Sequence, residues 1–247
     1  MNNNKFTFDI VLYDKHLIIH DQDNIILVDT GSPTTLHNKP EFEFCGRKFQ
    51  SSSSNLLTNI DDVSNLLGMR ITTLLGTDIL SQYKIVIDYR ERQFILSENK
   101  LEEFGHLIPF DFIQKIPVVE LEIKNRTLRF FLDSGAKISY LDSDLTKHLN
   151  TIGKENDFYP GIGAFSTPIY EELTQIGGHD FNAHYGNLPK VMEQLLRHNQ
   201  IQGIIGFDFF MNFRVGIDYQ DMKLNLENFY SKILTSTNSK AFGSSFF

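Results

Sequence analysis

Short apolar runs separated by polar turns recur along the whole chain, and most of them alternate between apolar and polar positions, as half-buried β-strands do. In the first half this pattern predicts strands at residues 6–12, 17–20, 25–28, 41–49, 85–89 and 93–96. In the second half it predicts strands at residues 118–123, 128–132, 215–219 and 223–226. The chain is therefore expected to be all-β, that is, β-rich with short helices.

Two segments have helical periodicity instead. Residues 60–67 carry two acidic side chains near their start, which favours a helix N-terminus there. Residues 189–197 open with a proline, which suits the first turn of a helix, and continue with an apolar stripe of Val191, Leu195 and Leu196. Each predicted helix comes shortly before one copy of a repeated segment.

The sequence contains an internal duplication. Residues 25–36 (IILVDTGSPTTL) match residues 130–141 (FFLDSGAKISYL), and residues 74–89 (LLGTDILSQYKIVIDY) match residues 204–219 (IIGFDFFMNFRVGIDY) without a gap. The two motifs follow one another in the same order in both halves. Two similar lobes related by a pseudo-twofold axis are therefore expected.

The lobes are expected to divide in the polar stretch at residues 97–106. This places an N-terminal lobe at residues 1–100 and a C-terminal lobe at residues 101–230. Residues 231–247 are Ser-rich and belong to neither repeat, so a flexible or simply docked tail is expected there. The alternative is a tail that lies in the cleft between the lobes and inhibits the protein or is processed by it.

Charge and hydropathy exclude several classes of partner. The formal net charge is −8 and there is no long Lys/Arg run, which argues against nucleic acid. Residues 1–10 lack the apolar stretch of a secretory signal, and no window approaches the ~20 apolar residues of a membrane span. A soluble, cytoplasmic protein without membrane association is expected.

Metal and redox chemistry are not expected either. Cys45 is the only cysteine, which excludes an internal disulfide and a cysteine-rich zinc site, so Cys45 is expected to be a packing or turn residue. His179 and His184 have no third ligand nearby in a recognisable pattern, so they are expected to be loop or surface residues. No metal and no organic cofactor is predicted.

Candidate chemistry lies in the repeated D-[TS]-G motif. One copy would be weak evidence, because such tripeptides are common in turns. Here Asp29 and Asp133 each follow an apolar strand and each precede an apolar-Gly-x-Asp segment. Two carboxyl groups about 3 Å apart cannot both ionise, so they share one proton. Such a pair can take a proton from water and give one to a carbonyl oxygen, as amide hydrolysis requires.

The residues beside the two aspartates suit a supporting role in the active-site loops. Gly31 and Gly135 let the backbone turn tightly, so that N–H groups point at the carboxylates. Thr30 and Ser134 offer hydroxyl groups that can tie one loop to the other.

The two loops differ at the next position, where Ser32 in the first copy stands against Ala136 in the second. Ser32 is expected to hydrogen-bond the outer oxygen of Asp29, a bond that Ala136 cannot make to Asp133. Asp29 is therefore predicted to be the more readily ionised partner and the base in the resting state.

On these motifs the sequence resembles the retropepsin and pepsin clan of aspartic proteases, nearest to retroviral-type and bacterial retropepsin-like members, over nearly the whole chain. The resemblance implies that Asp29 and Asp133 are catalytic and that Thr30 and Ser134 form a hydrogen-bond lock between the lobes. It also implies two structural segments that cross behind the active-site loops, which contain Gly76, Asp78, Gly206 and Asp208. Because 104 residues separate the two aspartates, about one retroviral lobe, a two-lobe acid-protease barrel fold fused in one chain is expected, as a monomer.

Proteases of this clan close a β-hairpin flap over the substrate. The interval from Asp29 to Gly76 is 47 residues and leaves little room for a long flap, whereas the interval from Asp133 to Gly206 is 73 residues. The flap is therefore predicted within residues 158–185.

Four aspartates repeated between the halves are expected to be structural: Asp78, Asp88, Asp208 and Asp218. Their place after the start of each crossing segment suits hydrogen bonds to backbone amides or ion pairs with Lys84 and Arg214. None of the four is expected to take part in the chemistry.

Taken together, the residues predict an aspartic endopeptidase that hydrolyses a peptide bond with a water activated between Asp29 and Asp133. The substrate is expected to be an extended peptide or protein that binds through main-chain hydrogen bonds, with apolar residues on both sides of the scissile bond. The alternative is a catalytically silent, retropepsin-like peptide-binding or regulatory module, because a fold does not fix a function.

Overall fold

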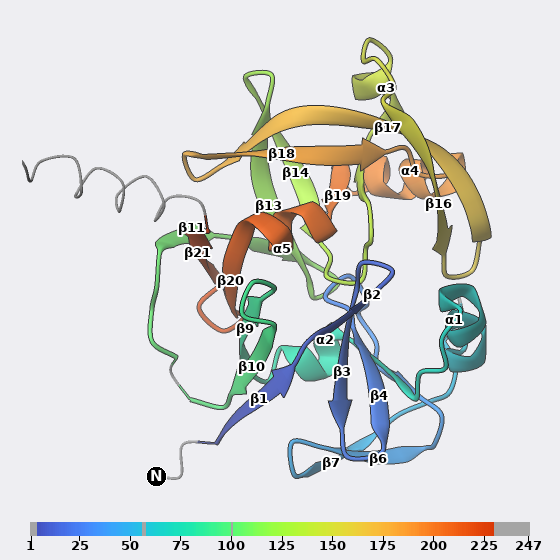
Figure 1. Cartoon of the computed structure of the whole chain (residues 1–247), viewed down its shortest axis with the longest axis vertical. Helices are drawn as coiled ribbons and strands as arrows, with labels where there is room; N and C mark the ends of the chain where they lie inside the picture. Colours follow the sequence, from blue (N-terminus) through green and yellow to red (C-terminus); the bar gives the residue numbers. More distant parts are fainter. Residues whose placement is uncertain (1–3, 56–57, 100, 230–247) are drawn as a thin grey trace, which may run out of the picture.

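The two halves of the chain fold as two lobes, which the computed structural model describes over residues 4–55, 58–99 and 101–229 (Figure 1). The tail predicted at residues 231–247 lies outside the described residues. The predicted division at residue 100 falls between the strands that end at Ser97 and begin at His106, and it stays a prediction.

The first lobe is built on a five-stranded sheet of order β2-β3-β4-β8-β5. Its strands β4 and β8 are apolar and parallel, with Val28 beside Leu75, and both of these residues are fully buried. The strands are β2 (Val11–Tyr13), β3 (His16–Asp21), β4 (Asn24–Val28), β8 (Thr73–Leu75) and β5 (Leu36–His37).

The second lobe repeats this strand order and then extends it. The order β12-β13-β14-β19-β15 matches that of the first lobe, with β14 and β19 as the parallel pair, and the sheet continues through β18, β17 and β16. In the first half, the described residues at this point of the chain form β6 (Glu41–Phe44) and β7 (Arg47–Gln50), a separate two-stranded sheet that does not extend the five-stranded one. The strands are β12 (Asp111–Ile113), β13 (Ile116–Ile123), β14 (Arg126–Leu132), β19 (Gly203–Ile205), β15 (Ser139–Leu141), β18 (His179–Gly186), β17 (Gly163–Ile176) and β16 (Gly153–Tyr159).

A six-stranded antiparallel sheet joins the lobes, in the order β1-β10-β9-β20-β21-β11. Val86 on β9 lies opposite Gly216 on β20, and these two residues occupy equivalent positions in the sequence repeat. The pseudo-twofold axis therefore passes between them. The strands are β1 (Lys5–Asp9), β10 (Gln93–Ser97), β9 (Lys84–Asp88), β20 (Phe213–Asp218), β21 (Lys223–Asn228) and β11 (His106–Pro109).

Two predicted strands divide differently in the structure. The strand predicted at residues 6–12 breaks at the buried Ile10, so that β1 joins the inter-lobe sheet and β2 joins the five-stranded sheet. Residues 41–49 form a hairpin of β6 (Glu41–Phe44) and β7 (Arg47–Gln50), which turns at Cys45 and Gly46 with φ values of 52° and 70°. Cys45 is buried in this turn, which confirms its predicted packing and turn role.

The helices of the described residues are short: α1 (Ile60–Leu67), α2 (Thr77–Leu80), α3 (Ser143–Thr146), α4 (Lys190–His198) and α5 (Phe207–Asn212). Helix α1 has the predicted bounds, and the Asn59 side chain caps it by accepting from the N–H of Asp62 at 2.8 Å. None of these helices is long and apolar enough to cross a membrane.

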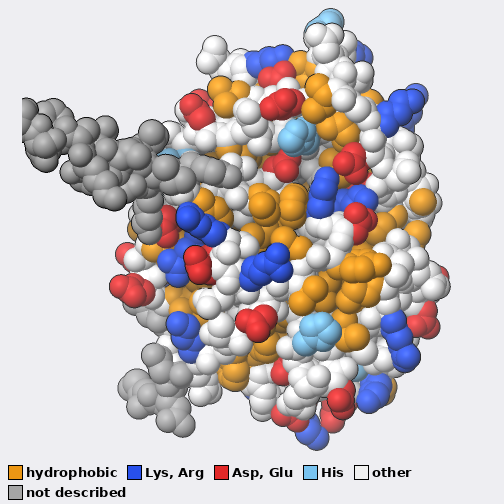
Figure 2. All heavy atoms as spheres, in the orientation of Figure 1, with side chains coloured by type: hydrophobic (Ala, Val, Ile, Leu, Met, Phe, Trp, Pro, Cys, Tyr) orange, Lys and Arg blue, Asp and Glu red, His pale blue; other side chains and the backbone are white. Residues whose placement is uncertain are grey.

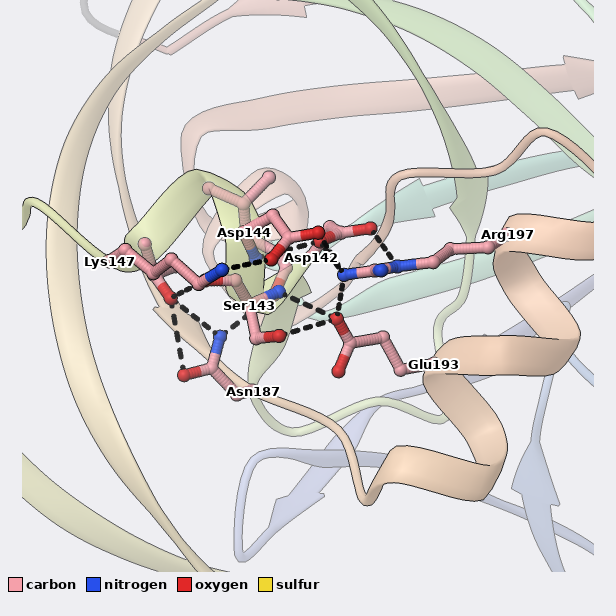
Figure 3. A network of polar contacts seen from close by, with 9 residues as sticks. Asp142, Ser143, Asp144, Lys147, Asn187, Glu193 and Arg197 are labelled. Atoms are coloured by element: carbon pink, nitrogen blue, oxygen red, sulfur yellow. Dashed lines mark hydrogen bonds and ion pairs between the residues drawn. The ribbon is translucent and has the colours of Figure 1, made fainter.

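Helix α4 lies one residue beyond its predicted range, and its predicted apolar stripe is wrong. Leu196 is buried, but Val191 and Leu195 are each 55% exposed. Ion pairs fix the C-terminal end of the helix instead. Arg197 lies among three carboxylates at 2.5–2.8 Å, those of Asp142, Asp144 and Glu193 (Figure 3).

Candidate active site

Asp29 and Asp133 lie directly after two equivalent strands, β4 and β14. The N–H of Asp29 donates to the carbonyl of Leu75 at 3.0 Å, and the N–H of Asp133 donates to the carbonyl of Ile205 at 3.0 Å. Each loop is thus tied to the parallel neighbour of its strand, β8 in one lobe and β19 in the other. The two aspartates are held in the same way on both sides of the pseudo-twofold axis.

Thr30 and Ser134 connect the two loops by a reciprocal set of hydrogen bonds. The Thr30 N–H donates to Ser134 Oγ at 3.1 Å, and the Ser134 N–H donates to Thr30 Oγ1 at 2.9 Å. Each hydroxyl then donates across the axis, Thr30 to the carbonyl of Leu132 at 2.8 Å and Ser134 to the carbonyl of Val28 at 2.9 Å. Both side chains are buried, so the lock between the lobes has no competition from water.

Gly31 and Gly135 leave room for the opposite carboxyl group. A Cβ on Gly135 would lie 2.7 Å from Cγ of Asp29, and a Cβ on Gly31 would overlap the carboxyl of Asp133. Any larger residue at either position would push the two acids apart. The glycines are therefore required by the close approach of the loops.

The two carboxyl groups lie half-buried at the bottom of the site and hydrogen-bond one another. Backbone N–H groups of both loops support them. Asp29 Oδ1 accepts from the Gly31 N–H at 2.9 Å, and the Ser32 N–H also stabilises its charged form. Asp133 Oδ1 accepts from the N–H groups of Gly135 at 2.8 Å and Ala136 at 3.1 Å. Hydrogen bonds to a carboxylate favour its charged form, so the backbone stabilises both anions.

The pKa values of the pair follow mainly from burial. Burial raises the pKa of Asp29 well above 3.8, and the charge of Asp133 and the shared hydrogen bond raise it further. Burial also raises the pKa of Asp133, while the hydrogen bonds from Asp29, Gly135 and Ala136 act in the opposite direction. Both carboxyls thus favour the protonated form more than a free aspartate does, which suits a pair that shares one proton.

The hydrogen bond predicted from the Ser32 hydroxyl to Asp29 is wrong. The Ser32 hydroxyl donates to the carbonyl of Thr34 at 2.9 Å, because this backbone acceptor lies nearby. The prediction that Asp29 is the more readily ionised partner loses that support and stays a prediction.

The first crossing segment supports its loop through Asp78. The Asp78 carboxylate accepts from the N–H of Thr35 at 2.9 Å and from its hydroxyl at 2.6 Å. The same hydroxyl accepts from the Gly76 N–H at 2.9 Å. The chain from Gly76 to Asp78 thus fixes the end of the loop that carries the first aspartate, as the structural role expected for Asp78 requires.

The second crossing segment is built differently. The Gly206 N–H donates to Ser139 Oγ at 3.0 Å, which is equivalent to the bond from the Gly76 N–H to the Thr35 hydroxyl in the first half. Asp208, however, accepts from the backbone N–H of His184 at 2.7 Å and lies 3.0 Å from its Nδ1. His184 lies on strand β18 and not in a loop, so Asp208 ties its segment to a strand of the extended second-lobe sheet.

A cavity of about 150 Å³ opens above the two carboxyls. Gly31, Ser32, Gly135 and Ala136 line its floor, and Phe158, Tyr159 and Pro160 line it from the hairpin β16–β17. In Figure 1 this hairpin extends from the second lobe toward α1 of the first lobe. Phe158 packs against an apolar cluster of the first lobe that includes buried residues of that helix.

The hairpin β16–β17 borders the cavity and is the candidate for the predicted flap. Its turn lies between Tyr159 and Gly163, which pair with one another, and Gly161 and Gly163 have φ values of 81° and 95° that suit glycine. The flap was expected within residues 158–185, and the hairpin spans Gly153 to Ile176, so it starts earlier and ends earlier than that range. Burial raises the pKa of Tyr159, and the charges of Asp133 and Asp29 raise it further, so its hydroxyl stays protonated beside the pair.

Sequence reasoning missed three residues that line the same cavity: His16, Tyr140 and Asp157. Tyr140 could have been found, because it occupies the position in the second repeat that Leu36 occupies in the first. Asp157 carried no such signal, because it lies between the two repeated segments, at residues 130–141 and 204–219, and belongs to neither.

No protein-family model and no curated protein sequence matches the chain. Among solved structures, the chain is similar to the crystal structure of an aspartic proteinase from Irpex lacteus, with a TM-score of 0.52 and 11% sequence identity. The match covers 91% of this chain and 97% of that chain. At this identity the likeness shows the fold alone, which is the two-lobe, pepsin-like aspartic proteinase fold, and this confirms the predicted fold class.

Proposed function

We propose that the chain is an aspartic endopeptidase that hydrolyses peptide bonds. One observation carries the proposal: the half-buried carboxyl groups of Asp29 and Asp133, from equivalent loops, hydrogen-bond one another at the bottom of a cavity. Pairs of titratable groups whose surroundings push their pKa values apart are the usual arrangement of an acid and a base. The fold shared with an aspartic proteinase supports the same activity.

We assign the role of acid to Asp29 and that of base to Asp133, because the charge of Asp133 and the shared hydrogen bond both raise the pKa of Asp29. Asp133 takes a proton from a water molecule whose oxygen attacks the carbonyl carbon, while Asp29 gives its proton to the carbonyl oxygen. In the second step the C–N bond of the tetrahedral intermediate breaks. Asp133 passes its proton to the amine nitrogen and Asp29 recovers one from the intermediate, so the pair again holds one proton.

An extended peptide is the substrate that the flap favours. Strand β16 ends the strand order of its sheet, so its outer edge has no strand partner among the described residues. Such an edge can pair with a peptide through main-chain hydrogen bonds.

We also propose that the chain is a retropepsin-like enzyme with both lobes fused. Thr30 and Ser134, which form the lock, are 104 residues apart, and the first five strands of the two lobe sheets match in order. A monomeric state and a cytoplasmic location stay predictions from the sequence.

The test is cleavage of denatured casein and of a mixed peptide library by the purified chain across a range of pH. Asp29→Asn and Asp133→Asn should each lower the rate by at least about 100-fold, because each removes the acid or the base. Asp180→Asn, on an exposed part of β18, is the matched control and should cleave at the unaltered rate. Cleavage that survives both active-site changes would exclude the proposal, and no cleavage by any variant would favour a silent peptide-binding module.

A further inference from the structure

The cavity above the two aspartates has two chemically different sides. On the first-lobe side its lining includes four aliphatic side chains, Leu27, Leu36, Val63 and Leu74, beside polar residues such as His16 and Thr58. On the second-lobe side the lining includes Ala136, Tyr140, Asp157 and Ile204. Leu36 and Tyr140 occupy equivalent positions of the repeat, so the two sides are variants of one subsite, and only the second carries an acidic side chain besides the catalytic pair.

The flap strand β16 covers the two sides with alternate side chains. Phe158 faces the first lobe, where it packs against the apolar cluster and stacks on His16 with ring centroids 5.7 Å apart. Asp157, the residue before it, faces the second lobe, where its carboxylate accepts a hydrogen bond from the Tyr140 hydroxyl. An acid therefore covers the side of the cavity that belongs to Asp133.

The Asp157 carboxylate is buried without a cation among the residues that line the cavity. Asp157 is only 8% exposed. No lysine or arginine is among the described residues that line the cavity. It accepts from Tyr140 and from the Phe158 N–H, whereas a carboxylate has about four acceptor positions. The nearby Lys137 is held by Asp14 at 2.8 Å.

Burial raises the pKa of Asp157, and the hydrogen bonds from Tyr140 and Phe158 together with the charges of Lys137 and His16 only partly oppose this. The carboxylate thus remains short of favourable partners in this structure. A cationic group entering the cavity would supply the missing interaction.

Building on the peptidase function, we propose that Asp157 determines substrate specificity by binding the cationic side chain of a lysine or arginine next to the scissile bond. The basic residue lies on the Asp133 side of the cavity, and the first-lobe side, with its four aliphatic side chains, receives an apolar residue. The substrates are then peptides with one apolar and one basic residue flanking the cleaved bond. This replaces the expectation of apolar residues on both sides.

A purely structural role for Asp157 makes different predictions. Its bond to Tyr140 also fixes β16 against β15, so losing the bond could displace the flap for every substrate alike. Asp157→Asn keeps an acceptor for the Tyr140 hydroxyl and removes only the charge. Tyr140→Phe removes the hydroxyl and keeps the charge, so the two variants separate specificity from positioning.

The test compares peptides that differ in one side chain, with Phe on one side of the scissile bond and either lysine or its uncharged analogue norleucine on the other, in both orders. When the varied residue lies on the Asp133 side of the cavity, the wild-type chain should cleave the lysine peptide with a kcat/KM at least about tenfold higher than the norleucine peptide. A hydrogen bond to a charged group contributes about that much. Asp157→Asn should abolish this preference and still cleave the norleucine peptide. Tyr140→Phe and the remote control Asp180→Asn should keep it.

A binding measurement decides the inference separately from catalysis. Non-cleavable analogues of the same peptides, with the scissile amide reduced, are titrated by calorimetry into the wild-type chain and into Asp157→Asn. Tighter binding of the lysine analogue by the wild-type chain alone supports the role of Asp157, even if no peptide is cleaved. An equal preference in both chains, or a preference for norleucine, would overturn it while leaving the peptidase proposal intact.

Discussion

Burying two carboxyl groups together lowers the stability of the folded chain as soon as they ionise. The pKa of Asp29 is raised well above 3.8, first by burial and then by the charge of Asp133. A carboxyl with a raised folded-state pKa contributes its full stability below the unfolded-state pKa, and this contribution is lost as the pH rises through the folded-state pKa. At neutral pH the pair therefore weakens the fold that holds it.

Asp29→Asn should stabilise the chain at pH 7. The amide has the shape of the protonated carboxyl, can donate to the ionised Asp133, and carries no charge to bury. We expect a gain on the order of 1 kcal/mol in the free energy of unfolding at pH 7, which disappears near pH 3.5, where the wild-type carboxyl is protonated in both states. Urea unfolding at the two pH values measures it, with Asp180→Asn as control. A loss of stability at pH 7 would contradict the account.

The lock residues should stabilise the fold as a unit. Thr30→Val and Ser134→Ala each leave a backbone carbonyl and a backbone N–H buried without a partner, so each should cost about 1–3 kcal/mol. The two changes break different bonds of one network, so the double variant should cost clearly less than the sum, because the first change already loosens the loops that the second bond pair holds. Thermal unfolding provides the comparison, and Thr127→Val, on the exposed start of β14, should have almost no effect. Additive losses would mean that the two hydroxyls act independently.

At the level of residues, the sequence predicted what the duplication repeats. Asp29, Asp133 and the two lock residues were identifiable because each appears twice after an apolar strand. The hydroxyl of Ser32 was not predictable, because its choice of the Thr34 carbonyl depends on how the loop turns locally. Asp157 was not predictable either, since it belongs to neither repeated segment.

The flap hairpin is an element of the second lobe that rests on the first. Phe158 stacks on His16, and Glu155 lies 3.3 Å from Lys15, both contacts with the turn between β2 and β3. Both members of the ion pair are about 40% exposed, so the pair contributes little. The apolar and aromatic contacts of Phe158 are therefore expected to contribute most to binding the flap to the first lobe.

Phe158→Ala should loosen the flap without unfolding the lobe. Hydrogen exchange of the β16 amides should become faster by about tenfold or more, because the hairpin opens when its apolar contact is lost. The KM of any peptide substrate should rise with it. Leu173→Ala on the same hairpin, where the side chain is 59% exposed, is the control and should exchange like the wild-type chain. Unchanged exchange in Phe158→Ala would show that another contact holds the flap.

Elements with local signals were predicted well and elements that depend on long-range pairing were not. Helix α1 has a capping residue and two acidic residues in its first turn, and its bounds were predicted correctly. Strands β16–β18 lie in a stretch with several glycines, and β17 pairs with β13, β16 and β18 along its length. Their identity as strands comes from those partners rather than from their own pattern.

On the scale of the whole molecule, two ion pairs cross between the halves at the inter-lobe sheet. Lys84 of the first half pairs with Asp218 of the second, and Arg214 of the second half lies 3.5 Å from Asp88 of the first. Asp88 also accepts from the Glu91 N–H at 2.9 Å, in line with its expected structural role. These pairs, together with the lock at the active-site loops, hold the lobes in one relative position.

Lys84→Met should destabilise the whole chain by about 2 kcal/mol, because it leaves the half-buried carboxylate of Asp218 without its cation. Burial alone would raise the pKa of Asp218, but the hydrogen bonds from Lys84, Asp221 and Gln220 outweigh it and lower the pKa. The stability from this carboxylate is therefore present above its unfolded-state pKa and lost as the pH falls through its folded-state pKa.

The effect of Lys84→Met should accordingly shrink toward low pH, and Asp218→Asn should recover part of the loss. Urea unfolding of the single and double variants at pH 7 and pH 3 measures both. Lys124→Met is the control, because it removes the cation that pairs with Glu172 at a site where the lysine side chain is 57% exposed. It should change the free energy of unfolding by less than about 1 kcal/mol. An equally small effect of Lys84→Met would mean that the crossed pairs do not hold the lobes.

The face seen in Figure 1 has no concentration of one charge that would attract a charged substrate toward the cavity. Figure 2 shows acidic and basic side chains interspersed on the face seen in Figure 1, with hydrophobic side chains across its middle. The net charge of −8 gives a basic peptide only a general attraction. Discrimination between peptides is therefore expected at the cavity and not on this face.

The account as a whole depends on Asp29 and Asp133 sharing one proton, and carbon-13 NMR titration of the aspartate carboxyls tests this directly. We predict that Asp29 titrates well above pH 3.8 and that Asp133→Asn lowers its pKa, since the neighbouring charge is gone. Titration of Asp29 near pH 3.8, unmoved by Asp133→Asn, would contradict the shared proton and the chemistry that follows from it.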